Sequence, residues 1–332
     1  MYVNKCQQAL DLAIAILTAL GIPPNDKTEG PCSPDEGIVF LGILIRTSDC
    51  SLTVAPDHQK YAEAKVSDIL HKKEATVKQL QSLAGILSWI SQVYTPGRPR
   101  RGALFRAVSS LERSHARTTS VRGELAQTLR WWQHTLRGRP ISSSFFWDRQ
   151  PYMPLIRSDA SGEDGWAACA MQFHVVGVWP EAWKQSSGPG APGMLFKELV
   201  PVVVITMLLA PWCSKDTVFA AALDNAGADF VINSLTSNCA WSNTLLRAFV
   251  DTLSFNRIGV VADHVYREYN THADTMSHPI PDVHWCSLVQ RASVHKSHRL
   301  EIHFVVHDLN TNDCFAATMS FAPPTTLGVN GV

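Results

Sequence analysis

The sequence predicts an α/β fold in which a mixed five-stranded sheet with flanking helices follows a mostly helical first half. Strand-like runs appear from residue 154 on, first as a hairpin-type series and then alternating with helical runs. Before that point, apolar residues recur mainly at helical spacing. With 332 residues, 45% of them hydrophobic, the chain can bury a sizeable core. We therefore expect two domains, or one domain with appendages.

The first half begins with a predicted helix at 4–20, which stops at Gly21 ahead of two prolines. Two β-branched runs then flank the polar residues 47–50, a pattern typical of a hairpin. Amphipathic helices are predicted at 57–73, 76–94 and 121–136. Thr76 is the expected N-cap of the second of these.

The second half contains the elements of the predicted sheet. Strands are expected at 154–159, 165–172, 175–179, 217–223 and 257–262, and helices at 195–209, 227–235 and 243–254. After residue 281 the sequence is polar and is expected to be irregular, with 298–309 as its one strand-like piece.

Neither a membrane span nor a disulfide framework is predicted. The longest apolar run, 199–212, covers about 14 residues and is shorter than the roughly 18 to 20 that a bilayer requires, so a buried helix is expected. The first residues lack the pattern of a secretory signal, which favours an intracellular protein, cytoplasmic or nuclear. The eight cysteines include no CxxC pair and are expected to be reduced.

The formal net charge of zero conceals a basic segment in the middle of the chain. From Lys60 to Arg139 there are 15 Lys and Arg against 5 Asp and Glu. Such a segment, with Trp131 and Trp132 near its end, is typical of a surface that follows a phosphate backbone and stacks bases. An ordinary solvated helix face with two core tryptophans explains it equally well.

Four acidic residues flank apolar elements. Asp159 ends the first strand of the predicted sheet, Glu198 lies in the first turn of an apolar helix, Asp224 follows a strand, and Asp274 lies in "REYNTHADTMSH". Taken singly, each is well explained as a solvated strand end or a helix cap. Ends of neighbouring central strands meet at one edge of a sheet, however, so the four carboxylates are expected to share one pocket.

Carboxylates gathered in this way need cations. Two unit charges about 4 Å apart repel by roughly 4 kcal/mol at an effective dielectric near 20, which corresponds to about three pKa units. Oxygen ligands favour Mg²⁺ or Mn²⁺ over zinc. Two such ions about 4 Å apart can activate water and neutralise a leaving oxygen during attack on phosphorus.

Four motifs carry a resemblance to a known family. In order they are "SDASGEDGWAA", "KELVPVV", "ALDNAGADFVINSL" and "REYNTHADTMSH", spread over about 125 residues. In this order they resemble the ribonuclease H domain of retrotransposon polyproteins in which reverse transcriptase is fused to the nuclease. The resemblance implies a ribonuclease H-like fold and a two-metal set of Asp159, Glu198, Asp224 and Asp274. Asn225 and Asn270 match positions that flank the third and fourth acids and are expected to contact nucleic acid.

The upstream half is similar to the end of a reverse transcriptase. In "GIPPNDKTEGPCSPDEGIVFLGILI", Lys27 precedes the residues 40–42, which resemble a hairpin that grips the primer. The resemblance implies a palm end at 1–55, a basic thumb or connection at 56–150, a nuclease domain at 151–280 and an irregular tail at 281–332. No Asp-Asp dipeptide occurs in the chain, so polymerisation is not expected.

Further site residues are predicted around these motifs. Arg98, Arg100, Arg101 and Trp131 are expected to contact the nucleic acid, because the family places the RNA–DNA hybrid in this region. The resemblance also implies a mobile histidine near the last aspartate, for which His272 and His264 are candidates and an ordinary structural role is the alternative. The histidines of "HADTMSHPIPDVH" match no standard zinc spacing. Asp164, Asp229 and Asp263 are expected to be solvated.

These observations predict a metal-dependent endonuclease that hydrolyses the RNA strand of RNA–DNA hybrids. One alternative is a catalytically silent retroelement remnant that only binds nucleic acid through the basic segment. Another is a protein-interaction module whose carboxylates are scattered. The sequence does not determine the oligomeric state.

Overall fold

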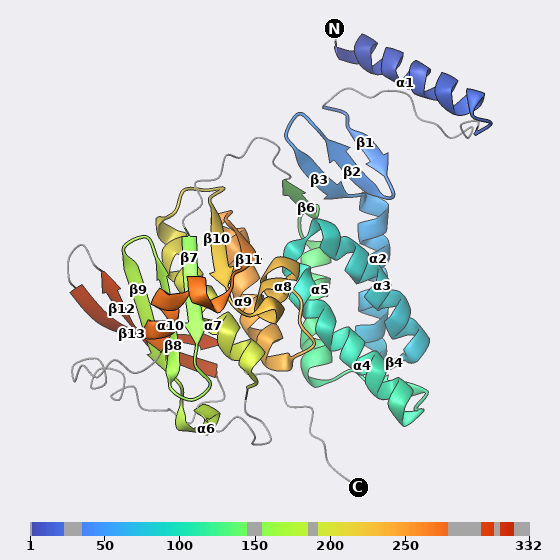
Figure 1. Ribbon diagram of the computed structural model, residues 1–332. Helices are drawn as coiled ribbons and strands as arrows, with labels where there is room; N and C mark the ends of the chain where they lie inside the picture. The colour runs from blue at the N-terminus through green and yellow to red at the C-terminus, as the bar shows by residue number, and fades with distance from the viewer. Residues whose placement is uncertain are drawn as a thin grey trace.

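The computed structural model describes residues 2–22, 35–144, 155–184, 192–277, 300–308 and 313–321. It has a mixed α/β architecture with two separate hydrophobic cores, one in the upstream helical part and one around a mixed sheet (Figure 1). The predicted fold class is confirmed at this level.

The upstream part combines helices with short strands. Its elements are α1 (Tyr2–Ala19), β1 (Ile38–Phe40), β2 (Ile43–Arg46), β3 (Ser51–Val54), α2 (Pro56–Lys72), β4 (Glu74–Thr76), α3 (Val77–Val93), η1 (Thr95–Arg100), α4 (Arg101–Ser114), β5 (Thr118–Ser120), α5 (Gly123–Arg137) and β6 (Ser142–Ser144). The predicted hairpin is β2–β3, and Thr76 caps α3 by accepting from the Gln79 backbone N–H in a capping box.

Helix α4 was missing from the sequence prediction. Its buried residues are Ala103, Leu104, Val108 and Leu111, of which the last three are three to four residues apart, and the helix packs on α3 and α5. The predicted boundary at residue 55 is wrong as a structural division. Val54 lies within the core of the helical part, Ile43 and Leu52 pack against it, and β3 pairs with β6, so the hairpin and the helices form one body.

The residues 40–42 lie in another hairpin, β1–β2, in which Phe40 ends β1 and residues 41 and 42 form the turn. Leu41 and Gly42 both have positive φ, 48° and 79°, as a two-residue turn of type I′ requires. Gly42 also lies against His58, which a Cβ would meet at 2.7 Å. Phe40 and Leu41 are largely exposed. Lys27 lies outside the described residues.

The downstream part is built on one mixed sheet. Its elements are β7 (Leu155–Ala160), β8 (Gly165–Ala170), β9 (Phe173–Val178), α6 (Glu181–Lys184), α7 (Met194–Leu209), η2 (Ala210–Trp212), β10 (Val218–Leu223), α8 (Ala226–Ser234), α9 (Ala240–Asn256), β11 (Gly259–His264), η3 (Arg267–Tyr269), α10 (Thr271–Ser277), β12 (Leu300–Asp308) and β13 (Asp313–Phe321). All five predicted strands and all three predicted helices occur, with ends shifted by up to three residues.

The sheet has seven strands rather than the predicted five, in the order β11-β10-β7-β8-β9-β12-β13. Strand β7 is parallel to β10 and antiparallel to β8, so it is central. The two extra strands come from the tail that was predicted to be irregular. Strand β12 pairs with β9, and β13 pairs with β12. The first strand of this hairpin corresponds to the predicted strand-like piece 298–309. The alternation of apolar and polar residues in the second strand was too weak to predict it.

Helices cover the sheet and shape its core. Helix α7 packs against β7, β8 and α9, while α10 lies across β7 and β8, in front of the sheet in Figure 1. The segment Met194–Trp212 is long and apolar enough to cross a membrane, but 72% of its most apolar window is buried inside the fold. It is the central helix of the downstream core.

Ion pairs, each with one buried partner, join the two parts of the chain. Glu124 of α5, 8% exposed, accepts hydrogen bonds from Arg106 of α4 and Arg247 of α9, each as short as 2.6 Å. Arg100, 7% exposed, binds Asp251 of α9 at 2.7 Å. Each part therefore supplies one cation and one carboxylate to the contacts between α9 and the helical part.

Candidate metal centre

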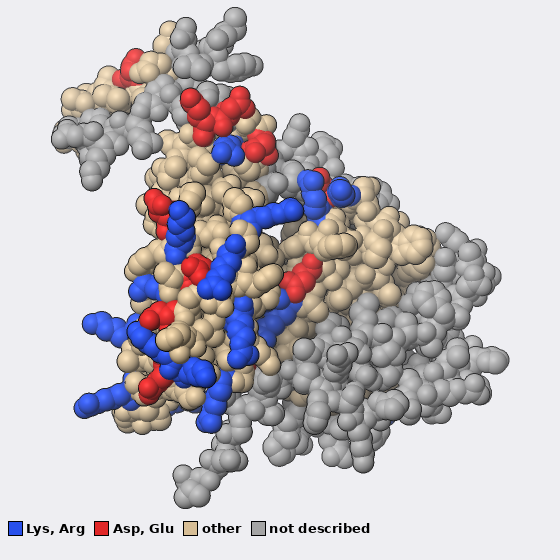
Figure 2. All heavy atoms as spheres, turned by 180° about the vertical axis from the view of Figure 1, so that it is seen from behind, with Lys and Arg blue, Asp and Glu red and all other residues tan. Residues whose placement is uncertain are grey.

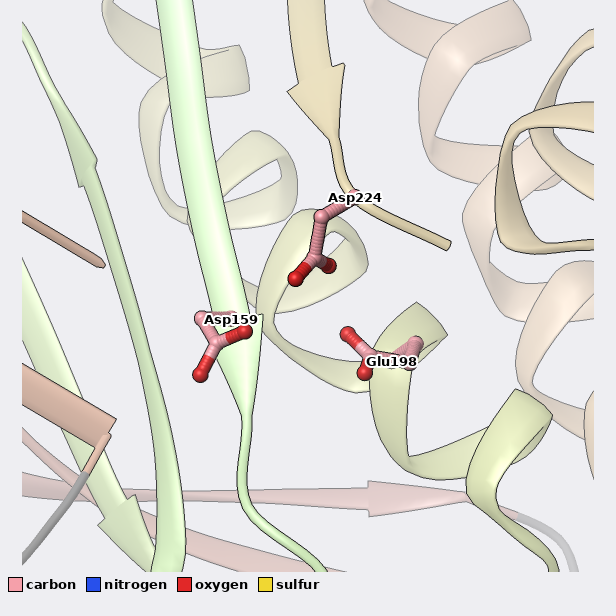
Figure 3. A group of neighbouring side chains, drawn as sticks. All are labelled: Asp159, Glu198 and Asp224. Carbon is pink, nitrogen blue, oxygen red and sulfur yellow. The ribbon is translucent and has the colours of Figure 1, made fainter. Parts of the chain in front are cut away.

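Three carboxylates from three different elements converge beside the sheet. Asp159 lies near the end of β7, Glu198 lies in α7, and Asp224 directly follows β10. One carboxylate oxygen from each residue lies within 4.8 Å of the others. In Figure 3 all three side chains point toward a common space between the strand ends and the helix. The predicted convergence is confirmed for these three residues.

The strand register explains how two of them meet. Strands β7 and β10 are parallel, with Ala222 opposite Arg157. Continuing that register by two residues brings Asp224 beside Asp159. Glu198 reaches the same place from helix α7, which begins at Met194 and packs against β7. Glu198 lies in the second turn of this helix, on the side that faces the end of the strand.

The surroundings of Glu198 oppose the charged form of its carboxylate. It is 7% exposed, and no described residue donates a hydrogen bond to it. Burial, followed by the charges of Asp159 and Asp224, raises the pKa of Glu198 to about 8. Burial and then Asp159 also raise the pKa of Asp224. A buried, unpartnered carboxylate beside two others is satisfied either by a proton or by a cation.

Asp159 also accepts a hydrogen bond from another described residue. The hydroxyl of Ser277, at the end of α10, donates to Asp159 Oδ2 at 2.5 Å. Ser277 is 3% exposed, so this hydrogen bond is shielded from water. The sequence prediction missed Ser277, because nothing in its pattern relates it to a residue 118 positions earlier.

Asp274 does not belong to the group of three. It lies in α10, where its Oδ1 accepts from Nη2 and Nε of Arg267 at 2.6 and 3.0 Å. It remains near enough for its charge to contribute to the raised pKa of Asp224. The prediction of one joint pocket therefore needs correction for Asp274, whose carboxylate is paired with an arginine that the sequence prediction overlooked.

The two predicted asparagines make contacts within the fold. Asn270 is 1% exposed and donates to the Ser158 carbonyl, which is incompatible with its predicted contact to nucleic acid. Asn225 is the N-cap of α8 and accepts from the backbone N–H groups of Gly227 and Ala228. A cap at this point fixes the chain immediately after Asp224.

The remaining residues predicted near the site do not belong to the group of three, as far as the structure describes them. His264 is exposed at the end of β11 with its ring edge-on to Tyr266, and Asp263 beside it is also exposed. His272 lies in α10, but its side chain is outside the described part of the structure, as are His278 and His284. Asp164 and Asp229 are half-buried and do not join the group of three.

Two of the predicted nucleic-acid contacts are occupied within the protein. Arg100 is buried, ion-paired with Asp251 and stacked 3.9 Å from the ring centroid of Trp131, which also packs on Tyr94 and Trp132. These roles at the interface correct the prediction for Arg100 and Trp131.

Arg98 and Arg101 differ from Arg100. They are half-buried and donate to the backbone carbonyls of Ser91 and Arg98, and no described carboxylate pairs with either. Burial lowers the pKa of both groups, and their mutual repulsion lowers that of Arg101 further.

The donor set of the centre suits a hard cation. Asp159, Glu198 and Asp224 offer oxygen ligands only, and no cysteine or histidine of the described residues belongs to the group. Such ligands fit Mg²⁺ or Mn²⁺ better than zinc. The three residues can hold a metal ion, and the unpartnered Glu198 is the observation that calls for one.

The chain matches no protein-family model. No curated protein matches it either.

Proposed function

We propose that this protein is a metal-dependent endonuclease that hydrolyses the RNA strand of RNA–DNA hybrids. The convergence of Asp159, Glu198 and Asp224 carries the proposal, because three carboxylates within 4.8 Å, two of them buried and one half-buried, are suited to a divalent ion. The five predicted strands, with acidic residues at two strand ends and in the helix between them, support a ribonuclease H-like identity and an origin in a retrotransposon polyprotein. Such a nuclease would act in the cytoplasm or the nucleus, where hybrids form.

The ligand roles follow from position. Asp159 lies on the central strand β7, between β10 and β8, and would contact both ions. Glu198 and Asp224 would hold one ion, and Asp274 the other. When bound, two Mg²⁺ or Mn²⁺ ions supply an activated water and neutralise the leaving oxygen. The chain itself contributes orientation, because the Ser277 hydroxyl fixes the carboxylate of Asp159 and α8, capped by Asn225, fixes the backbone after Asp224.

The basic side chains on the surface of the helical part support the proposal that the substrate is a nucleic acid. Figure 2 shows Lys and Arg side chains along the face of this part that is turned to the viewer, with fewer acidic ones between them. Since Arg98 and Arg101 pair with no described carboxylate, they are the predicted phosphate contacts that remain after Arg100 is assigned to the interface. Recognition of the RNA strand would rest on its 2′-hydroxyl groups in the minor groove.

A cleavage assay on strand-labelled duplexes tests the proposal. With Mg²⁺ or Mn²⁺, we expect the full chain to cut the RNA strand of a hybrid and to leave a DNA duplex of the same sequence intact. Asp224→Asn should abolish the cut. Asp263→Asn is the matched control, because Asp263 is an exposed aspartate near the site but outside the group of three, and it should cleave at the wild-type rate. Cleavage that persists in Asp224→Asn defeats the assignment.

The silent remnant is the second candidate. The pairing of Asp274 with Arg267 favours it, because one of the four family ligands is engaged elsewhere. Binding of the hybrid that weakens with salt, without any metal-dependent cleavage, would support this alternative. The remaining alternative, a protein-interaction module, assumed that the four carboxylates are scattered. Three of the four converge, so this assumption does not hold.

A further inference from the structure

Arg267 is a cation placed at the rim of an acidic centre. It lies in η3, between β11 and α10, and its side chain is 70% exposed. Its guanidinium binds Asp274 directly, and its charge also lowers the pKa values of Glu198 and Asp224. One arginine thus offsets part of the negative charge of the whole group.

The residues around Arg267 form an exposed surface beside the carboxylates. Tyr266 and Tyr269, on either side in sequence, are 69% and 67% exposed, and His264 lies edge-on to Tyr266. Aromatic rings beside a guanidinium are suited to the bases and phosphates of a nucleic-acid strand. None of these side chains was singled out by the metal-ligand motif.

We infer that Arg267 is an exchangeable counter-cation that holds Asp274 until substrate arrives. In the free protein the ion pair occupies Asp274 and opposes a second divalent ion. When a phosphate of the nucleic-acid strand reaches the rim, the guanidinium moves to that phosphate and releases Asp274 as a ligand. The inference rests on the proposed nuclease function and adds that binding of the second ion depends on substrate.

The strength of the contacts supports such an exchange. An exposed ion pair contributes little to stability, because water screens both charges. A guanidinium binds a phosphate at least as well as a carboxylate, through paired N–H donors. A divalent ion at Asp274 would also lie beside the guanidinium charge, so the two cations compete for one carboxylate.

The ion pair is not needed to hold α10 in place. Asn270, in the residue before α10, donates to the Ser158 carbonyl at 2.8 Å, and Ser277 at the end of the helix donates to Asp159 at 2.5 Å. Both contacts are buried and both reach β7. Removal of the Arg267 guanidinium should therefore change the charge at the rim without displacing Asp274 from the sheet.

Calorimetric titration of the full chain with Mn²⁺, without nucleic acid, tests the first half of the inference. Wild-type protein should bind one ion firmly and a second ion weakly. Arg267→Ala should tighten the second site about threefold or more, which is the scale of one exposed ion pair. Arg267→Lys keeps a cation and should leave the second site close to wild type. The control is Arg137→Ala, which breaks an ion pair with Glu63 of comparable exposure in the helical part.

Hybrid binding in the presence of a chelator tests the second half. Arg267→Ala should weaken binding of an RNA–DNA hybrid and lower the slope of log K against log salt by about one, because one phosphate contact is lost. Arg267→Lys should restore most of the affinity. Tighter ion binding together with weaker hybrid binding in one variant is a result that a purely structural role for Arg267 would not produce.

The outcomes separate this inference from the function on which it rests. If wild-type protein cleaves hybrids and Arg267→Ala binds Mn²⁺ as wild type does, the counter-cation role is wrong and the nuclease stands. An unchanged hybrid affinity in Arg267→Ala likewise removes the transfer to phosphate. Should wild-type protein take up no Mn²⁺ and leave the hybrid uncut, the nuclease itself fails, and this inference fails with it.

Discussion

Asn270 donates a 2.8 Å hydrogen bond from Nδ2 to the backbone carbonyl of Ser158, one residue before Asp159. The contact joins residues 112 positions apart and ties the start of α10 to the central strand. With Ser277 at the other end of the helix, it fixes the distance between the helix that carries Asp274 and the strand that carries Asp159. The geometry of the centre therefore depends on a side chain that is itself 1% exposed.

Substitution of Asn270 should affect stability and cleavage but not substrate affinity. Asn270→Ala leaves the Ser158 carbonyl without its side-chain donor, so we expect the free energy of unfolding to fall by about 1–3 kcal/mol. Cleavage should fall with it, because α10 loses its anchor, while the Kd for the hybrid stays unchanged. Urea unfolding and a binding titration measure the two effects. Asn256→Ala, which removes a partly exposed hydrogen bond within α9, is the control, and a weakened hybrid Kd in Asn270→Ala would contradict this role.

The raised pKa of Glu198 predicts a reversed pH dependence in the absence of metal. A carboxyl whose pKa is about 8 when folded, against an ordinary 4.5, binds its proton more tightly in the folded state. Stability is then lost as the pH rises from about 4.5 to about 8, by up to about 1.4 kcal/mol per pH unit. Urea unfolding with a chelator at pH 5.5 and pH 8 measures this loss.

Two further measurements isolate Glu198. The variant Glu198→Gln should remove most of the pH dependence, because it cannot ionise. Added Mg²⁺ should stabilise wild-type protein more at pH 8 than at pH 5.5, since the ion binds the ionised carboxylate. An equal effect of Mg²⁺ at both pH values would show that Glu198 does not take part in binding the ion.

Glu124 should be the most sensitive position of the interface between the two parts. Glu124→Ala leaves the guanidinium groups of Arg106 and Arg247 facing each other without their shared carboxylate. Loss of one partner from a buried ion pair costs about 3 kcal/mol, so the free energy of unfolding should fall by roughly that amount. Glu63→Ala, which removes the more exposed pair with Arg137, should cost less than about 1 kcal/mol. Equal losses for the two variants would contradict the importance of burial here.

The strands of the tail should protect one edge of the sheet. Val175 and Val176 of β9 lie opposite Val306 and Val305 of β12. After deletion of residues 300–321, the β9 amides that face β12 should exchange with deuterium about tenfold faster or more, because they lose their acceptors. Amides of β7, which has neighbours on both sides, serve as the internal reference. Unchanged exchange in β9 would mean that the edge is covered in another way.

The sequence was sufficient to predict those features that depend only on local residue patterns and on the general geometry of sheets. Alternating and apolar runs predicted β7 to β11, and acids at strand ends predicted the meeting of Asp159 with Asp224. Contacts that depend on tertiary packing were not predictable. The link from Ser277 to Asp159 and the burial of Arg100 against Trp131 arise only when distant segments meet. Arg267 stands seven residues before Asp274, yet its side chain could equally have faced solvent, so no pattern assigned the pair.

The shared carboxylate of Glu124 has a mechanical consequence. Because the helical part and the sheet part are locked together by this residue, a duplex gripped by the basic helices would be presented to the acidic centre at a constant offset along its axis. If the basic helices hold the end of a hybrid, the proposed nuclease should then cut at one distance from that end, set by the spacing of the two parts, and the cut positions should spread when Glu124 is replaced by Ala.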